Sequence, residues 1–252
     1  MKTMNNGLNL ISPQWPVSKK KILSFNTTRQ GGFSQSPYAS LNLGDHVFDA
    51  QESVIQNRKH IAHQCKFTRE PLWLNQTHSS IVIDSEQHHP GIEADAIISR
   101  TPSQPLVIMT ADCLPILLCN QQATEVAAIH AGWKSLSSSI IRHTLERMHS
   151  SPQDIIAWLG PCISQTHFEV GLEVRDAFAA IDNNFKAGFA PHPDPNKTKA
   201  CLHTLASNQF KILGVSKIYR SDLCTYQNQE LFFSYRREKI TGRMGAFISI
   251  LN

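Results

Sequence analysis

Short apolar runs are the feature that most constrains the fold of this chain. Ten runs of four to six residues have the length of β-strands, and segments of uneven length separate them. Because neither a fixed repeat nor a regular strand–helix alternation orders the runs, they do not fit a solenoid or a simple doubly wound sheet. The pattern predicts a mixed α+β fold, with strands at Ile22–Thr27, Leu72–Asn75, Ile81–Asp84, Ala94–Ser99, Leu106–Thr110, Glu125–His130, Ile155–Leu159, Lys217–Arg220, Leu231–Tyr235 and Ala246–Ile250.

Amphipathic segments predict four helices between these strands. Ser135 is a suitable N-cap for the second helix, and the three prolines of Ala187–Lys199 predict an exposed loop. A chain of 252 residues can bury one large core, and no change in composition marks a second domain. We therefore expect a single domain over residues 1–252, with helices at Glu52–Gln64, Leu136–Met148, Leu172–Ala180 and Lys199–Leu213.

Composition and charge narrow the class of protein. The chain is 41% hydrophobic and 17% charged, which is typical of a globular protein with a packed core. Its net charge of +4 is spread thinly, with Lys19–Lys21 and Arg236–Arg237 as the only basic clusters, so we do not expect a nucleic-acid partner. The six cysteines form no Cys-x-x-Cys pair, which in a reducing compartment predicts free thiols.

The chain contains neither a secretory signal nor a membrane-spanning stretch that the sequence pattern would reveal. Asparagines and prolines interrupt Met1–Pro16, so this stretch lacks the apolar core of a secretory signal. The most apolar stretch, Leu106–Cys119, is too short to cross a bilayer. We expect a cytoplasmic protein with no membrane partner, and the sequence carries no signal for an oligomeric state.

Three short segments place a metal-binding residue type beside an apolar run. They contain His78, Cys113 and His130. The ends of core strands lie at the rim of a cleft, so these side chains could converge despite their separation in sequence. Two imidazoles and a thiolate suit zinc, and three protein ligands leave one position for water or substrate, as in catalytic zinc sites.

Each of these residues also has an ordinary structural explanation. A single cysteine beside an apolar run is most often a small buried hydrophobic residue. A single histidine at a strand end is most often a hydrogen-bonded residue without a metal. Spacing alone therefore leaves the zinc site at Cys113 and the two histidines open, because widely separated ligands have no compact sequence signature.

The segments around the three residues are part of a longer series of blocks. In number and order these blocks resemble the YfiH/laccase-domain family, also called the multicopper polyphenol oxidase or purine nucleoside phosphorylase family, which includes the bacterial peptidoglycan editing factor. The resemblance implies one α+β domain of layered sheets flanked by helices, in an α/β/β/α arrangement, and a zinc site at His78, Cys113 and His130. The matching blocks lie at residues 28–32, 41–46, 57–58, 76–78, 93–96, 110–115, 130–133, 159–163, 222–226, 233–237 and 241–243.

The resemblance also implies a substrate class. It implies phosphorolysis of adenosine, inosine and methylthioadenosine together with adenosine deamination, so that the partners are small molecules, a purine nucleoside and phosphate. A zinc ion with an open position can serve both reactions. Asp95 and Asp112 are candidates for orienting an imidazole or for acid–base catalysis. Candidates for substrate binding are Arg29, His46, Arg58, Lys134, Arg236 and Arg243.

Two departures from the family pattern concern residues next to the histidines. The chain has Lys134-Ser135 where the family often has Arg-Gly, and Ser79 where a glycine often follows the first histidine. Lysine keeps the positive charge but lacks the planar two-pronged geometry of arginine. The metal triad itself is unaffected, and the sequence leaves the details of anion binding at this segment open.

Three other functions compete with a zinc nucleoside enzyme. A copper polyphenol oxidase ranks low because the twelve histidines include no His-x-His pair, so copper is a weaker candidate than zinc. A metal-free hydrolase, in which His130 activates the Cys113 thiol and an amino acid is removed from a peptidoglycan precursor, is the first alternative. A zinc-stabilised binding module without catalysis would need a fourth protein ligand.

Overall fold

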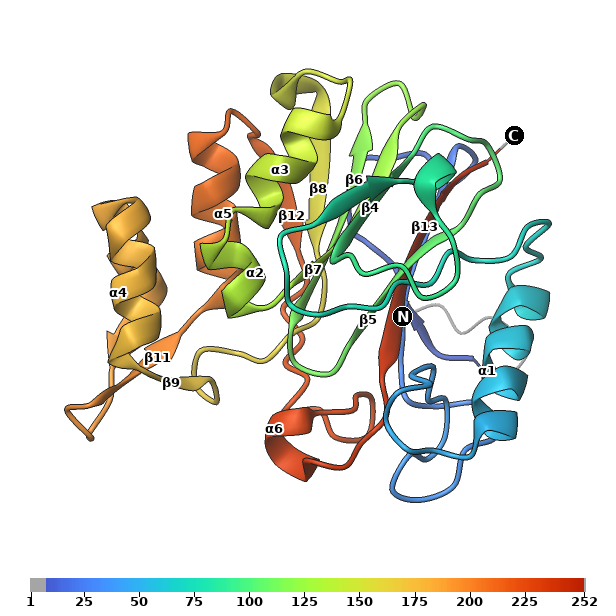
Figure 1. Ribbon diagram of the computed structural model, residues 1–252, viewed down its shortest axis with the longest axis horizontal. Coiled ribbons are helices and arrows are strands. Elements are labelled where there is room, and N and C mark those ends of the chain that lie inside the picture. Colours follow the sequence, from blue (N-terminus) through green and yellow to red (C-terminus); the bar gives the residue numbers. More distant parts are fainter. Residues whose placement is uncertain (1–7, 252) are drawn as a thin grey trace.

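The computed structural model describes residues 8–251, so the first seven residues of Met1–Pro16 lie outside the described part. It confirms a mixed α+β fold built from three sheets (Figure 1). Among residues 8–251, no helix is both long enough and apolar enough to span a membrane.

The largest sheet has six strands and combines parallel and antiparallel pairs. Neighbours among its four central strands, β8, β6, β7 and β4, run antiparallel, and the outer pairs β12–β8 and β3–β4 are parallel. Strands β6, β7, β4 and β8 are buried along their whole length, which explains why they are continuous apolar runs. In spatial order the strands are β12 (Lys217–Arg220), β8 (Ile155–Leu159), β6 (Leu114–Asn120), β7 (Val126–Ala131), β4 (Ala96–Ser99) and β3 (Val82–Asp84).

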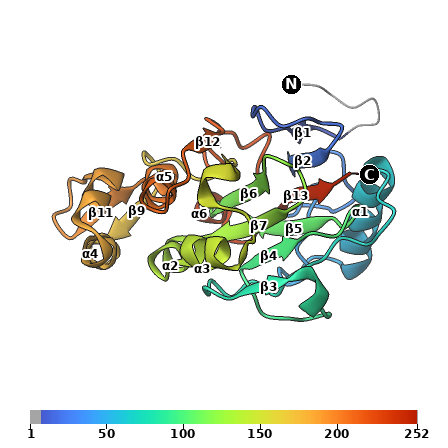
Figure 2. The ribbon, with the colours of Figure 1, turned by 90° about the horizontal axis from the view of Figure 1, so that it is seen from above.

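A second, antiparallel sheet packs against one face of the first (Figure 2). Leu117 and Trp158 of the first sheet share a core with Ile108 and Ile248 of the second. Burial of these large side chains between the sheets is a main source of folding free energy. In spatial order the second sheet contains β1 (Leu10–Ile11), β2 (Ile22–Thr27), β13 (Met244–Ile250) and β5 (Leu106–Thr110).

Helices cover the outer faces of the two sheets. On the six-stranded sheet, α2 (Trp133–Ser137), α3 (Ile140–Arg147) and α5 (Leu202–Ile212) bury their apolar side chains in one core. On the other side, α1 (Gln51–Gln64) packs Ile61 against Phe25 and Phe247 of the second sheet. This helix–sheet–sheet–helix order confirms the layered architecture that the sequence predicts.

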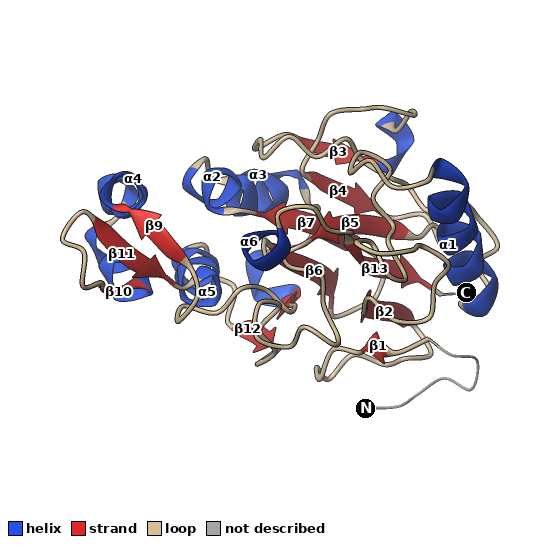
Figure 3. Cartoon of the chain, turned by 90° about the horizontal axis from the view of Figure 1, so that it is seen from below, coloured by secondary structure: helices blue, strands red, loops and turns tan. Residues whose placement is uncertain are grey.

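A third sheet of three short strands lies with α4 (Leu172–Ile181) at the end of the molecule away from α1 (Figure 3). It consists of β10 (Phe189–Pro191), β11 (Lys197–Ala200) and β9 (Glu169–Gly171). The loop predicted over Ala187–Lys199 is therefore wrong. Asp194 accepts the backbone N–H of Asn196 and orders the turn, and Pro191 is tolerated because β10 is an edge strand.

Several other elements differ from the sequence prediction. The helix predicted over Leu136–Met148 is broken into α2 and α3 at Ser139, which has a left-handed backbone with φ of 66°, while Gln209 of α5 donates to the carbonyl of Leu136. Leu72–Asn75 makes only isolated bridges, with Leu106 and Glu93. The helix predicted from Lys199 begins at Leu202, because β11 occupies the preceding residues.

The predicted strand Leu231–Tyr235 is also wrong. Phe232 and Phe233 are buried in a small separate core, and the Arg237 guanidinium binds the carbonyl of Phe232. The Ser234 hydroxyl instead caps α6 (Tyr235–Glu238) by accepting the Arg237 N–H. Three short 3-10 helices complete the structure, η1 (Ser85–Gln87), η2 (Pro152–Asp154) and η3 (Asn183–Gly188).

Candidate active site

The structure brings His78, Cys113 and His130 together. His130 is on β7, Cys113 is in the turn between β5 and β6, and His78 is in the segment before β3. One ligand atom from each residue lies within 4.8 Å of the other two, and Cys113 Sγ is 3.6 Å from His78 Nε2. The described part of the chain has no other cluster of three His, Cys, Asp or Glu ligand atoms this compact.

Asp95 forms hydrogen bonds with both histidines of the triad. This fully buried carboxylate lies 2.7 Å from Nδ1 of His130 and also accepts the backbone N–H groups of His78 and Ser79, at 3.1 Å and 2.6 Å. His78 has a left-handed backbone with φ of 60°, which these bonds stabilise. Because Nδ1 of His130 is occupied, Nε2 is the nitrogen available to a metal.

Electrostatics in the site favour a thiolate. Burial opposes ionisation of Cys113, but the charge of His130 and its hydrogen bond bring the thiol pKa below its ordinary value. Burial likewise opposes protonation of His130, but the Cys113 thiolate and the bond to Asp95 raise its pKa above the ordinary value. Burial also acts against ionised Asp95, yet its bonds from His130 and Ser79 keep its pKa low.

The residues present fit a metal ion. Zinc prefers imidazole and thiolate donors, and these three converge with one nitrogen or sulfur each. Gly132 keeps the space beside them open, because a Cβ at this position would lie 2.9 Å from His78 Cδ2 and 3.2 Å from Cys113 Sγ. The backbone at position 132 lies so close to the triad that only glycine fits there without a steric clash.

Two cavities meet at the triad and share four residues, His78, Ala111, Cys113 and Tyr235. The first, which we call the apolar cavity, has a volume of about 240 Å³ and is otherwise lined by Asp112, Trp133, Lys134, Ile163, Phe168, Leu202 and Arg236. The second, which we call the polar cavity, has a volume of about 440 Å³ and is otherwise lined by His46, Gln76, Met109, Thr110, His130 and Arg243. A larger cavity of about 530 Å³ between β1 and β12 contains none of the triad residues, so we place the site at the two smaller ones.

Comparison with known proteins identifies the family. The family described as multi-copper polyphenol oxidoreductase laccase matches residues 23–251 of the chain. The chain belongs to this family. The finding confirms the resemblance seen in the sequence blocks of this laccase-family protein.

Relatives of this laccase-family chain have consistent names. A protein of Shigella flexneri named purine nucleoside phosphorylase YfiH is 44% identical over 243 residues, which cover 96% of this chain and 99% of the relative. A purine nucleoside phosphorylase of Haemophilus influenzae is 40% identical, with 96% of this chain and 99% of the relative covered.

Solved structures agree with the fold. A Neisseria meningitidis protein has a TM-score of 0.92 at 38% identity and covers 97% of this chain and 100% of its own. The Geobacillus stearothermophilus protein YlmD has a TM-score of 0.90 at 27% identity and covers 100% of this chain and 98% of its own.

The substrate-binding candidates of this family member divide into two groups. Lys134 and Arg236 line the apolar cavity, and His46 and Arg243 line the polar cavity. Arg29 and Arg58 line neither. Arg29 forms an ion pair with Glu238 at 3.2 Å, and Arg58 donates to the carbonyl of Leu43 and stacks on Trp73, so both have structural contacts.

Asp112 ties the Cys113 turn to the opposite wall of the apolar cavity. Its carboxylate accepts the hydroxyls of Thr225 and Ser234, at 2.7 Å and 3.0 Å, and the backbone N–H of Arg236 at 2.7 Å. Its backbone has φ of 100°, in the left-handed region. Both carboxylate oxygens are occupied by these bonds, which hold the Cys113 turn in place.

Sequence reasoning missed several residues that line the cavities. Gln76, Thr110, Trp133 and Tyr235 lie within the family-like blocks, so their position in those blocks was an available signal. Phe168 lies outside them and had no such signal, because only folding brings it to the apolar cavity.

Proposed function

We propose that this protein is a zinc-dependent purine nucleoside enzyme that phosphorolyses adenosine, inosine and methylthioadenosine and deaminates adenosine. The observation that carries the proposal is the position of the His78–Cys113–His130 triad between two cavities. Relatives more than 40% identical over nearly the whole chain bear the name purine nucleoside phosphorylase, which supports the same substrate class.

The donor set supports zinc over copper. The triad offers two imidazole nitrogens and one thiolate, and no fourth protein ligand joins this cluster among the described residues. Zinc held by these residues would supply a Lewis acid that polarises the oxygen of water or phosphate. A non-catalytic structural zinc site would instead be closed by four protein ligands.

The protein's own residues supply orientation. Asp95 fixes the ring of His130 and the backbone of His78, so we propose that it acts as a positioning residue. The aromatic rings of Trp133 and Phe168 in the apolar cavity suit the planar faces of a purine base. Lys134 and Arg236 are the lysine and arginine side chains that line the same cavity.

A second candidate function is the thiol hydrolase acting on peptidoglycan precursors. It is favoured by the 3.6 Å contact between Cys113 Sγ and His78 Nε2, and by the His130 ring, which packs edge-on against the His78 ring with 4.7 Å between ring centres. In that function the thiolate would attack the carbonyl carbon of an amide, and an imidazole would give a proton to the departing amine. The two functions make opposite demands on Cys113, which a single set of measurements can distinguish.

The first prediction is that metal and activity are inseparable. Purified protein should contain about one zinc ion per chain. Removal of the zinc by a chelator should abolish inosine phosphorolysis and adenosine deamination. It should also expose Cys113 to iodoacetamide, because a coordinated thiolate resists alkylation. Mass spectrometry of the alkylated protein, metal analysis and product identification with and without phosphate give the three readouts.

Matched cysteine variants control for stability. Cys113→Ala should abolish turnover, whereas Cys201→Ala, at the N-cap of α5 and outside both cavities, should retain it. Rapid labelling of Cys113 in chelated protein that remains fully active would overturn the zinc enzyme, and amide hydrolysis by that metal-free protein would establish the hydrolase.

A further inference from the structure

Arg243 is a cation without an anionic partner in the polar cavity. Its Nη1 donates to the carbonyl oxygens of Thr241 and Gly242, both at 3.0 Å, and its Nε and Nη2 have no partner among the described residues. The side-chain stem packs against Gly44, where a Cβ would lie 2.8 Å from Arg243 Cγ. The guanidinium is therefore held in place with one two-pronged donor edge unused.

The other arginines differ from Arg243. Six arginines have a carboxylate oxygen within 3.2 Å, namely Arg29, Arg58, Arg100, Arg147, Arg175 and Arg237. Of those without such a pair in the described part of the chain, Arg69, Arg142 and Arg220 are exposed to solvent. Only Arg236 and Arg243 are both partly buried and unpaired, and each lines one of the two cavities at the triad.

Burial makes the charge of Arg243 costly. Desolvation lowers the pKa of its guanidinium, against the opposing charges of Cys113 and Asp112. The Asp112 carboxylate already accepts three hydrogen bonds from other groups, so it does not pair with Arg243. An anion in the polar cavity would compensate the buried positive charge.

A second donor in the polar cavity is also unused. Thr110, the last residue of β5, is buried, and its hydroxyl has no hydrogen-bond partner among the described residues. A buried hydroxyl without a partner is unusual in a native protein. It adds a neutral donor to the cavity that contains Arg243.

The apolar cavity offers a different environment. Its arginine, Arg236, already donates to the carbonyls of His167 and Glu169, at 3.3 Å and 3.0 Å, and its guanidinium lies over the ring of Phe168. Its other cation, Lys134, is exposed to solvent with Nζ 5.9 Å from the centre of the Trp133 ring, and its remaining walls include Ile163 and Leu202. This cavity suits a planar base better than a compact, strongly hydrated anion.

We propose that the two cavities bind the two reactants from opposite sides of the triad, with inorganic phosphate on Arg243 and Thr110 in the polar cavity and the nucleoside base in the apolar cavity. This inference rests on the proposed phosphorolysis and assigns its anion site. The ribose would then lie at the residues that both cavities share, which include His78, Cys113 and Tyr235.

The arrangement of the two cavities suits a reaction in which phosphate displaces the purine base from the ribose. A phosphate oxygen forms a bond to C1′ of the ribose while the bond from C1′ to N9 of the purine breaks, and the electron pair of that bond leaves with the base. The proton that hydrogen phosphate gives up ends on the base, so the products are ribose 1-phosphate and the free purine. If phosphate approaches C1′ from the side opposite the base, both reactants are already in position for the displacement of the base by phosphate.

The second prediction tests Arg243 by separating phosphate from nucleoside. Arg243→Met keeps the stem that packs on Gly44 and removes the charge. In zinc-loaded protein we expect the KM for phosphate in inosine phosphorolysis, and the Kd for inorganic phosphate measured by calorimetry, to rise about tenfold or more. Adenosine deamination needs no phosphate, so its kcat/KM should fall much less than the phosphate affinity does.

Three further variants sharpen the test. Arg243→Lys should recover only part of the phosphate affinity, because a lysine lacks the two-pronged edge. Arg236→Met should raise the KM for the nucleoside and leave that for phosphate unchanged. Arg142→Met, an exposed residue of α3, should match the wild type, and zinc content and thermal unfolding measured on every variant exclude loss of metal or fold.

The outcomes separate this inference from the proposed function. Phosphorolysis with an unchanged phosphate KM in Arg243→Met would overturn the anion site and leave the function standing. Phosphate binding that depends on Arg243 in a protein without phosphorolysis would retain the site and overturn the function. Loss of phosphate affinity in Arg236→Met instead would place phosphate in the apolar cavity and contradict the proposal.

Discussion

Asp95 shows how much of this site depends on one residue. Its two carboxylate oxygens accept the His130 ring N–H, the backbone N–H groups of His78 and Ser79, and the Ser79 hydroxyl. Ser79, which departs from the family pattern, thus contributes a bond that a glycine could not make. Asp95 aligns two of the three ligands although it binds no metal in our proposal.

The third prediction follows from this arrangement. In Asp95→Asn an amide N–H₂ would face groups that are themselves donors, so the alignment of His78 or His130 should fail. We expect zinc affinity to fall about 10- to 100-fold, measured by competition with a chromophoric chelator. Asp176→Asn, an exposed residue paired only with Arg175, is the matched control. Equal zinc affinity in the two variants would show that Asp95 does not orient the ligands.

A second Cys–His contact shows that proximity alone does not make a reactive pair. Cys162 Sγ lies 3.7 Å from His203 Nε2, a distance similar to that in the triad. Burial raises the pKa of this thiol well above its usual value and lowers that of His203, although the Gly160 carbonyl acts in the opposite direction on the imidazole. His203 Nε2 contacts the Gly160 carbonyl oxygen at 2.9 Å instead of a carboxylate, and burial is the largest influence on the pKa of both groups.

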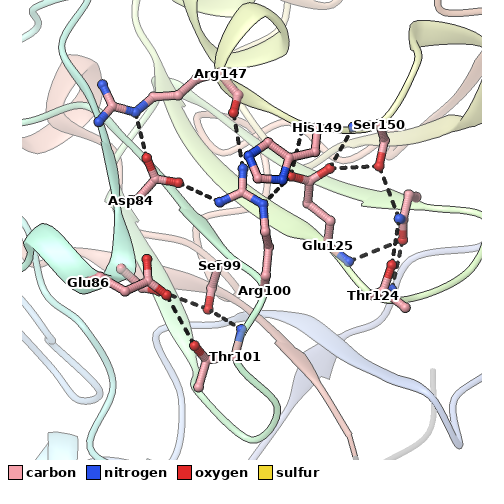
Figure 4. Close-up of polar contacts among 12 residues, drawn as sticks. Asp84, Glu86, Ser99, Arg100, Thr101, Thr124, Glu125, Arg147, His149 and Ser150 are labelled. Carbon is pink, nitrogen blue, oxygen red and sulfur yellow. Dashed lines mark hydrogen bonds and ion pairs between the residues drawn. The ribbon is translucent and has the colours of Figure 1, made fainter.

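At the scale of secondary-structure elements, an ionic network joins the ends of three strands and one helix (Figure 4). Asp84 at the end of β3 bonds Arg100 and Arg147 at 2.7 Å and 2.8 Å, and Glu125 before β7 lies 2.8 Å from Nε of Arg100 as a charge contact. Glu125 also accepts the hydroxyl and backbone N–H of Ser150. The network fixes the ends of β3, β4, β7 and α3 relative to one another.

The fourth prediction concerns the pH dependence of stability. Burial raises the pKa of Glu125, but bonds from Ser150 and His149 and the charge of Arg100 prevail and lower it below the usual value. A carboxyl with a depressed folded-state pKa stabilises the fold above its unfolded pKa, about 4.3 for glutamate, and loses that effect as pH falls through the folded value. Stability should therefore decline below about pH 5.

Denaturation of two glutamate variants isolates this group. Glu125→Gln should lower the unfolding free energy at pH 7 by about 1–3 kcal/mol, and the difference from wild type should shrink toward pH 3. Glu146→Gln, an exposed residue of α3, should follow the wild-type profile. A difference for Glu125→Gln that stays constant from pH 7 to pH 3 would contradict the linkage. The measurement is urea unfolding followed by circular dichroism at each pH.

At the scale of the whole molecule, the core between the two large sheets lies behind the site, not in it. Leu117 of β6 is fully buried there with Trp158 and Ile248. Cys113 is four residues earlier in the chain, about 13 Å along an extended strand. Global stability and the geometry of the triad should therefore respond to different substitutions.

The fifth prediction tests this separation. Leu117→Ala should lower the unfolding free energy by about 2–5 kcal/mol, seen as a lower Tm in calorimetry, while the folded protein at low temperature keeps its zinc and its KM for nucleoside. Ile212→Ala, at a half-exposed position on α5, should change stability by no more than about 0.5 kcal/mol. Loss of zinc from folded Leu117→Ala protein would show that the core and the site are coupled.

Local sequence patterns were sufficient to predict the strands whose ends are clearly marked in the sequence. The predicted strands Ile22–Thr27, Leu106–Thr110, Ile155–Leu159 and Lys217–Arg220 coincide with β2, β5, β8 and β12. The apolar stretch after Leu106 contains two strands, β5 and β6, and the sequence pattern predicted only the first. The second was missed because the tight turn at Asp112 has no glycine and β6 contains Pro115. The strands β10 and β11 of the third sheet were missed because their apolar pattern is short and weak.

For the site, the sequence determined which residue types were available, and the family-like blocks pointed to His78, Cys113 and His130. Only the tertiary structure decided what surrounds them. Asp95 and His130 are 35 residues apart, Asp112 and Ser234 are 122 apart, and Arg29 finds its carboxylate 209 residues away. Arg29 and Arg243 therefore looked equivalent in sequence, yet one is neutralised by Glu238 and the other is not paired. The physical reason is that charge compensation, burial and cavity shape depend on distances in space, which local sequence patterns do not encode.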